Sequence, residues 1–161
     1  MFQIWHSGIN HEEKHMTFAE KSQVITSAND AINDLIKATQ KVYKQVIEAF
    51  LKENEDISYI MLTGYTPSFN DGEPCTFTMH AGFDEVPSEF EEKYPDIAGR
   101  MTDNGLSFYK NENWKAFNDL ISSDLALHCF ERTFNPYGFQ ATYHIEDGEL
   151  VVNEYDYDCG Y

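Results

Sequence analysis

The sequence has few basic residues and no long apolar run. Its 161 residues include 11 Lys and Arg against 28 Asp and Glu, which gives a formal net charge of −17. So strong an acidic excess predicts a surface that repels nucleic acid, membrane surfaces and acidic substrates. No apolar stretch approaches the ~20 residues that cross a bilayer. We therefore expect no membrane-spanning segment and no membrane partner.

Cysteine is also scarce, and the sequence lacks the common catalytic signatures. The three cysteines, Cys75, Cys129 and Cys159, are far apart and form no CxxC pair. Such a set indicates a reducing compartment, and the start of the chain lacks the basic and apolar regions of a signal peptide, so we expect a cytoplasmic protein. Neither a glycine-rich phosphate loop nor a Ser-His-Asp or Cys-His set can be assembled. We expect no cofactor and no enzymatic activity.

The negative charge is unevenly distributed along the chain. Residues 1–54 carry seven acids and six lysines, whereas residues 55–161 carry 21 acids and five bases. An apolar content of 42%, with 15% aromatic residues, predicts a folded core rather than a disordered chain. The length predicts a single domain, and the order of helices and hairpins along the chain predicts the α+β class. Within it we expect an N-terminal arm over 1–16, a long helix over 17–54 and an acidic sheet domain over 55–161.

The long helix has a start signal and a helical period. Thr17 and Glu20 have the spacing of a capping box, in which each side chain satisfies the other residue's backbone amide. Apolar residues then recur every three or four positions from Val24 to Phe50, with no Pro or Gly between them. This broad apolar face is typical of a helix that lies on a sheet.

Four segments alternate between apolar and polar residues and predict two β-hairpins. They are 57–65, 75–81, 139–145 and 150–154, and Asp147-Gly148 between the last two is typical of a type I′ turn. Apolar residues on both faces of 57–65 predict a central strand. The sequence thus indicates a four-stranded antiparallel sheet with the long helix and a second helix packed on one face. The same alternation predicts that His80 and His144 are exposed.

The second helix is expected over 112–131, with a short additional helix over 88–94. The apolar face of the second helix would carry Trp114, Phe117, Ile121, Leu125 and His128. A histidine on such a face is more often a core residue than a metal ligand. We therefore expect His128 to be buried.

Acidic residues gather in two clusters, the second mixed with tyrosines. Carboxylates beside aromatic rings favour a protein-binding surface, because rings supply buried contact area and charges steer the encounter with a basic partner. A highly soluble acidic surface is the competing interpretation. The candidate residues are Asp84, Glu85, Glu89, Glu91, Glu92 and Asp96 in the first cluster, and Tyr155, Asp156, Tyr157 and Asp158 in the second.

A lysine stripe on the long helix offers an alternative function. Lys37, Lys41 and Lys44 stand at i, i+4 and i+7, so they share one helix face. Such a stripe could follow the phosphates of double-stranded DNA and release counterions there. It could equally be an ordinary solvated face.

A second alternative is a metal-dependent hydrolase, because residues 11–15 match H-E-x-x-H. His11 and His15 would bind a metal ion, Glu12 would act as the base, and His6 could be a third ligand. Two features oppose this. The positions between the motif residues are charged, and the motif precedes the expected helix start. A solvated arm explains the segment better.

Two segments resemble a known group of proteins. Tyr65–Cys75 reads Y-T-P-S-F-N-D-G-E-P-C, and the final hairpin runs from Tyr137 to Asp158. The chain resembles uncharacterised small phage and bacterial proteins that share Y-T-P-x-F-N-D-G-[DE]-P-C. In length and acidity it is also similar to T-even phage modulators of the heat-shock sigma factor. The resemblance implies a phage-type accessory protein in the host cytoplasm, and the acidic surface predicts that its partner is a basic host protein, such as a sigma factor or a DNA-binding protein. It assigns no catalytic residue.

Overall fold

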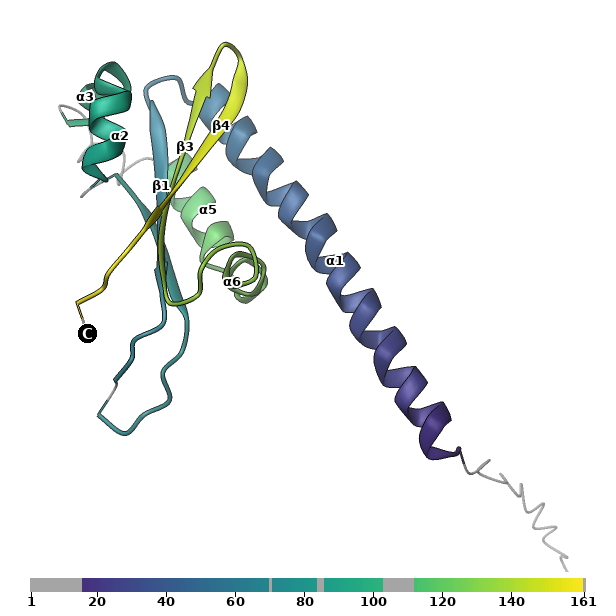
Figure 1. Ribbon diagram of the computed structural model, residues 1–161. Coiled ribbons are helices and arrows are strands. Elements are labelled where there is room, and N and C mark those ends of the chain that lie inside the picture. The colour runs from purple at the N-terminus through teal and green to yellow at the C-terminus, as the bar shows by residue number, and fades with distance from the viewer. Residues whose placement is uncertain (1–15, 70, 84–85, 103–111, 161) are drawn as a thin grey trace, which may run out of the picture. The chain divides into compact units, whose positions relative to one another are not determined.

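The computed structural model describes residues 16–69, 71–83, 86–102 and 112–160, with the side chains of 101 and 102 excepted (Figure 1). The chain divides into two compact units, Met1–Leu35 and Ile36–Tyr161. The first holds the beginning of the long helix. The second holds the rest of that helix, the sheet and the other helices.

The long helix α1 (Phe18–Glu53) begins and ends within one residue of the predicted bounds. Its capping box is confirmed. The Glu20 carboxylate accepts a 2.7 Å hydrogen bond from the Thr17 backbone amide, and Thr17 Oγ1 accepts one of 3.3 Å from the Glu20 amide. The hydrogen bond from the Thr17 amide is the main reason that the pKa of Glu20 lies below its ordinary value. Two of the otherwise unpaired amides at this helix start are thereby satisfied.

The sheet consists of β1 (Tyr59–Tyr65), β2 (Thr78–Gly82), β3 (Gly138–Glu146) and β4 (Glu149–Asp156), in the order β2-β1-β3-β4. Every pair is antiparallel, so both predicted hairpins and the α+β class are confirmed. Asp147 and Gly148 have φ values of 51° and 83°, as a type I′ turn requires. β1 is a central strand and is buried along almost its whole length, in agreement with its apolar residues on both faces.

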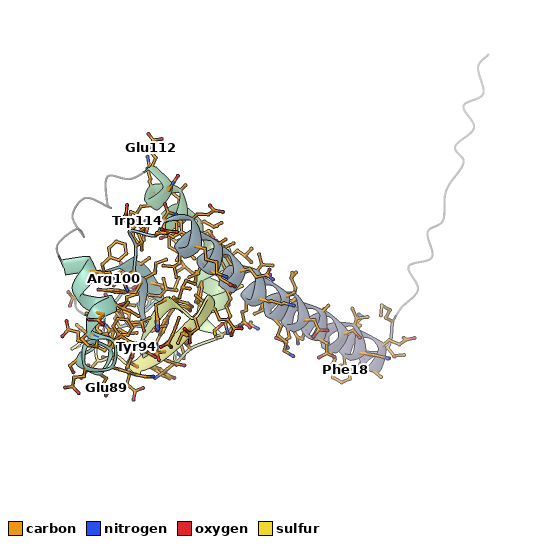
Figure 2. All side chains as sticks on the ribbon, turned by 90° about the horizontal axis from the view of Figure 1, so that it is seen from above. Phe18, Glu89, Tyr94, Arg100, Glu112 and Trp114 are labelled. Atoms are coloured by element: carbon orange, nitrogen blue, oxygen red, sulfur yellow. The ribbon has the colours of Figure 1, made fainter. Side chains whose placement is uncertain are left out.

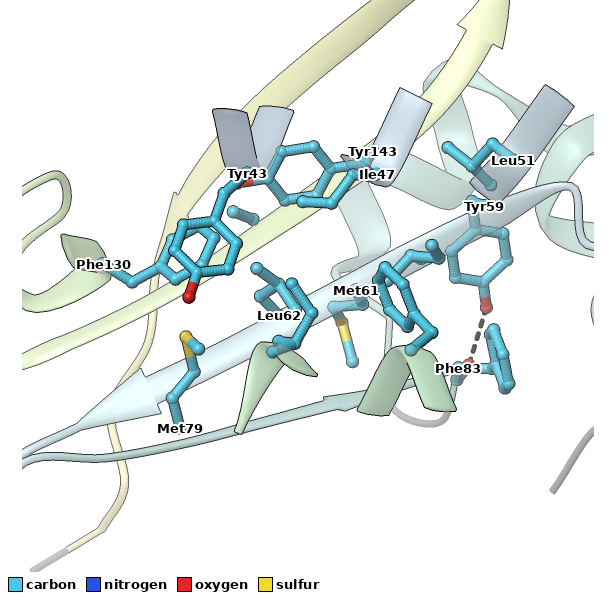
Figure 3. Packing of buried hydrophobic residues seen from close by; sticks show 14 of the residues in the cluster. Tyr43, Ile47, Leu51, Tyr59, Met61, Leu62, Met79, Phe83, Phe130 and Tyr143 are labelled. Atoms are coloured by element: carbon cyan, nitrogen blue, oxygen red, sulfur yellow. Dashed lines mark hydrogen bonds between the residues drawn. The ribbon is translucent and has the colours of Figure 1, made fainter. Parts of the chain in front are cut away.

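One face of the sheet packs against α1, α5 (Glu112–Ile121) and α6 (Asp124–Glu131). Aromatic rings join these helices: Phe50 of α1 stacks on Phe117 of α5 at 4.3 Å, and Tyr43 of α1 lies 5.5 Å from Phe130 of α6. Figure 3 shows the buried side chains of α1 turned toward the strands that carry Leu62 and Tyr143. This face contains most of the hydrophobic core.

The single helix predicted over 112–131 is wrong, because the chain breaks between α5 and α6. Ser123 caps α6, its hydroxyl accepting a 3.3 Å hydrogen bond from the Ala126 amide. The break changes the phase of the helical face. Cys129 and Phe130 are therefore buried, whereas Leu125 is exposed and the His128 side chain is 76% exposed. The expected core position of His128 is also wrong.

The other face of the sheet packs against α2 (Ser88–Lys93) and α3 (Pro95–Thr102). The sequence predicted α2 but not α3. Phe90 of α2 is fully buried, with its ring 5.2 Å from Tyr59 and 5.7 Å from His144. Because α2 covers it, His144 has no exposed surface, and its expected exposure is wrong. His80 of β2 points to the opposite face from buried Met79 and is exposed as expected.

Gly138, at the start of β3, permits a close backbone approach. A Cβ atom at this position would lie 1.9 Å from the carbonyl oxygen of Tyr157, whereas a Cβ on Gly99 in α3 would meet nothing within 4 Å. We expect Gly138→Ala to lower the free energy of unfolding by about 1–3 kcal/mol, since the backbone must move. Gly99→Ala should leave it unchanged or raise it by up to about 1 kcal/mol. Urea titration of both variants checks this, and equal effects would contradict the assigned contact.

Candidate protein-binding surface

Helix α2 places three exposed carboxylates over the second face of the sheet. Phe90 fixes the helix to the sheet, so Glu89, Glu91 and Glu92 are left on its solvent side. Figure 2 shows Glu89 on the outer side and Tyr94 turned toward the sheet. Acids in the first turn also interact favourably with the positive end of the helix dipole. The local sequence thus combines one apolar anchor with a carboxylate surface.

Lys93 connects α2 to the edge strand β4. Its Nζ lies 4.9 Å from the centre of the Tyr94 ring and 3.5 Å from Asn153 Oδ1, at the outer limit of a hydrogen bond. The Tyr94 hydroxyl, by hydrogen bonding and by charge, raises the pKa of Lys93 above its ordinary value, and the charges of Tyr155 and Glu146 add to this. This ammonium is therefore held among groups from α2, β3 and β4.

Tyr155 brings the two predicted clusters together. Partial burial is the main reason that its pKa lies above the ordinary value, and the nearby charges of Tyr94 and Glu89 also raise it. Glu89 belongs to the first predicted cluster and Tyr155 to the second, so the fold brings these distant segments side by side. We call this region the α2/β4 surface and define it by Glu89, Glu91, Glu92, Glu146 and Tyr155.

The rest of the second cluster does not join this surface as one group. Successive side chains of a strand point to opposite faces, and the register pairs Tyr155 with Gln140 but Asp156 with Phe139. Asp156 therefore lies on the opposite face from Tyr155. Tyr157 packs its ring 6.0 Å from Tyr65, and Asp158 accepts a 2.9 Å hydrogen bond from the Gly160 amide. The alternation that defines β4 divides the cluster.

The first cluster is mostly in place. Asp96 is exposed near the start of α3, where its carbonyl oxygen accepts a hydrogen bond from Arg100 Nε at 3.1 Å. Asp84 and Glu85 lie outside the residues that the structure describes. The cluster therefore contributes three carboxylates on α2 and one on α3.

The edge of the sheet next to this surface is strongly acidic. β4 pairs only with β3 among the described strands, so its outer edge is open there. Residues 133–161 contain six acids and no Lys or Arg. The acids in and beside β4 are exposed, namely Glu146, Asp147, Glu149, Glu154, Asp156 and Asp158. A basic segment would meet an attractive field along this edge.

The lysine stripe is exposed on α1. Lys37, Lys41 and Lys44 are all exposed, and their spacing places them on one flank of the helix, beside the face that carries buried Ile47. His6, His11 and His15 lie outside the described residues, so the metal-site hypothesis stays a prediction. Within the described ranges, no group of three or more His, Cys, Asp or Glu side chains could hold a metal ion.

Sequence reasoning missed the buried polar position at His144. Neither ring nitrogen has a hydrogen-bond partner among the described residues, and the Tyr94 ring lies 4.4 Å away. Burial lowers the pKa of His144, and the charge of Lys93 acts in the same direction, whereas Glu146 opposes both. A neutral imidazole is therefore favoured in the folded state. Only the packing of α2 reveals this, because β3 alternation alone assigned His144 to the exposed face.

Comparison with known proteins finds no match to a protein family, a curated protein or a solved structure. Among the described helices, none combines the length and apolar character needed to span a membrane.

The buried imidazole predicts a pH dependence of stability. Because burial lowers the folded-state pKa of His144 below its ordinary value of 6.5, the unfolded chain binds the proton more tightly. The contribution of neutral His144 to the free energy of unfolding is fully present above about pH 6.5. It is lost as pH falls from there toward the lowered pKa of the folded state. Between about pH 7.5 and pH 5.5 the Tm should fall, and His144→Phe should reduce this dependence.

The control is Ala141→Gly, a core substitution on the opposite sheet face that removes no titratable group. It should lower the Tm at every pH while keeping the pH dependence of the unsubstituted protein. Thermal unfolding followed by circular dichroism measures both. A pH dependence that His144→Phe leaves intact would contradict this role of the imidazole.

Proposed function

We propose that this chain is a non-enzymatic phage-type accessory protein that binds and modulates a basic host protein through the α2/β4 surface. The partner class is a sigma factor or another protein of the transcription or DNA-handling machinery in the host cytoplasm. The observation that carries the proposal is the contact region between α2 and β4. There, Glu89 of the first cluster lies near the half-buried Tyr155 of the second, and Lys93 of α2 reaches Asn153 of β4.

The composition of the surface suits recognition of a basic partner. Exposed carboxylates at the rim accelerate the encounter with Lys- and Arg-rich surfaces, and such steering weakens as salt rises. Tyr155 and Tyr94 supply aromatic area beside these charges, and interfaces use such rings as anchors. The outer edge of β4, which no other strand of the described ranges covers, also allows a basic extended segment to add as a further strand. The carboxylates, the tyrosine rings and the backbone edge of β4 could thus all contact a partner within one region.

Charge reversal on α2 tests the proposal. Glu89→Lys with Glu92→Lys should weaken binding of the host partner by about 10-fold or more, because the steering carboxylates are lost. Immobilised protein would first capture partners from a bacterial host lysate. The Kd of the identified partner would then be measured for the unsubstituted protein and for each variant at two salt concentrations.

The matched control makes the same change in net charge elsewhere. Glu112 and Asp119 are exposed on α5, and reversing both to Lys should leave the Kd within about 2-fold of the original. If the α2 double variant and the α5 double variant have the same Kd for the partner, only the total charge of the protein matters for binding. The proposed surface would then be wrong.

Binding of double-stranded DNA is a second candidate, favoured by the exposure of all three lysines of the stripe. Binding through them should give a log–log salt slope of about −2 to −3 in a gel-shift titration. Lys37→Glu with Lys41→Glu should abolish the shift. Reversal of the exposed Lys115 and Arg132 makes an equal charge change away from the stripe and should not. Absence of a shift at low salt would exclude this function.

A further inference from the structure

Helix α1 carries a second apolar stripe besides the one that packs on the sheet. The buried stripe contains Tyr43, Ile47 and Leu51. The second stripe has a strict seven-residue period. Its first series is Ile25, Ile32, Thr39 and Val46, and its second, three residues later, is Ala28, Leu35, Val42 and Ala49. A seven-residue repeat of this kind, sustained over four heptads, is typical of a coiled-coil seam.

Four large residues of this seam are exposed to solvent, whereas Val46 is half-buried and packs against the core. Exposed fractions are 62% for Ile25, 50% for Ile32, 63% for Leu35 and 54% for Val42. Scattered apolar residues on a surface need no explanation, but a continuous stripe of them on one helix face marks an interaction site. The lysines of the stripe described above point away from the seam, because Lys37 and Lys44 occupy the heptad position farthest from it.

The last part of the seam forms one wall of an apolar groove in the second unit. This groove between α1 and α5 has a volume of about 370 Å³, and Val46, Ala49, Phe50, Ala116, Phe117 and Leu120 are among its lining residues. Leu120 remains 44% exposed. The groove has the character expected of a site for a further helix, since small and large apolar side chains alternate along it.

We infer that two copies of this chain pair in an antiparallel coiled coil along α1, with the first turns of each α1 seated in the partner copy's α1/α5 groove. In an antiparallel pair, the two series of the seam face each other. One register, centred on Lys37, matches them throughout. Ile25 then faces Ala49 of the second copy, Ala28 faces Val46, Ile32 faces Val42 and Leu35 faces Thr39.

This register also matches residue size and end charge. Every layer except that of Ile32 and Val42 pairs a large side chain with Ala or Thr. This difference in size lets the layers interdigitate without voids. The next layer at either end brings Lys21 opposite Glu53 of the second copy. These are the charged residues that continue the seven-residue series beyond the apolar layers. The residue sizes along the seam and the charges at its ends therefore favour the same register.

The charge distribution favours α1 as the place where two copies meet. Helix α1 contains five lysines and five acids, so its formal net charge is zero, whereas residues 54–161 carry −16. Contact between two such acidic regions would be opposed by repulsion, and contact between two neutral helices would not. A second copy is thus accommodated where the chain carries no net charge.

The contact is long enough for a stable dimer. The shared segment from Lys21 to Glu53 is ~48 Å long at 1.5 Å per residue, and a helix is about 10–12 Å wide. The strip covered is therefore on the order of 500 Å² per chain, or ~1,000 Å² in total, which reaches the lower limit for specific interfaces. Insertion into the α1/α5 groove adds to that area.

Sedimentation velocity of the full chain over ~1–100 µM tests the pairing. The expected mass is twice the 18.6 kDa of one chain, and raising salt from ~0.05 to ~0.5 M should tighten the dimer by screening the acidic regions. Ile32→Glu should raise the dissociation constant about 100-fold or more. Gln23→Glu adds the same charge at an exposed position outside the seam and should have little effect.

Cysteine cross-linking tests orientation and register. In a Cys75→Ser, Cys159→Ser background, a chain with Ile32→Cys should form a disulfide with a chain carrying Val42→Cys, but not with itself. Circular dichroism confirms that each variant is folded. A monomer at every concentration, a dimer insensitive to Ile32→Glu, or self-linked Ile32→Cys chains would each overturn the inference.

Discussion

The contact on which the acidic surface depends is the packing of Phe90 against Tyr59 and His144. This single apolar side chain of α2 fixes the helix to the sheet while its neighbours in the sequence carry carboxylates. Tyr59 is itself held by a 2.6 Å hydrogen bond to the carbonyl oxygen of Phe83. Burial of one aromatic ring gains enough free energy to hold a short helix that has no side-chain cap at its start. The position of the exposed carboxylates of α2 thus depends on the aromatic contact that Phe90 makes beneath them.

The sequence predicted the elements whose signals are local. Capping by Thr17 and Glu20, the turn at Asp147 and Gly148, and the strand alternation each depend on neighbours within a few residues. The predictions that were wrong failed because they depend on contacts between segments that are distant in the sequence or on breaks that the local pattern does not show. Ser122 and Ser123 carry little helix-breaking character, yet Ser123 caps a new helix and turns His128 outward. His144 is buried by a helix more than 50 residues earlier in the chain, and periodicity on one strand contains no information about that helix.

The candidate site was predictable as two clusters but not as one surface. Composition alone identified the acids and tyrosines, because carboxylate-rich segments are visible in any sequence. Their combination depends on strand order, which places β4 at the edge beside α2. The division of Tyr155 from Asp156 also follows from pairing register rather than from composition. If α1 pairs two copies, the assembly carries two α2/β4 surfaces, and a partner with repeated basic sites gains avidity without any new contact.

The outer edge of β4, with which no described strand pairs, has a consequence for the behaviour of the protein in acid. An open edge strand is a template on which other chains can add, and natural proteins guard such edges with charge. The charges that protect the edge of β4 are almost all carboxylates, and the calculated isoelectric point of the chain is about 4.5. Acidification toward that pH removes the mutual repulsion between molecules while the backbone groups of the edge stay available. The feature that attracts a basic partner at neutral pH is therefore also what keeps these molecules dispersed, and mild acid favours precipitation through strand-to-strand addition.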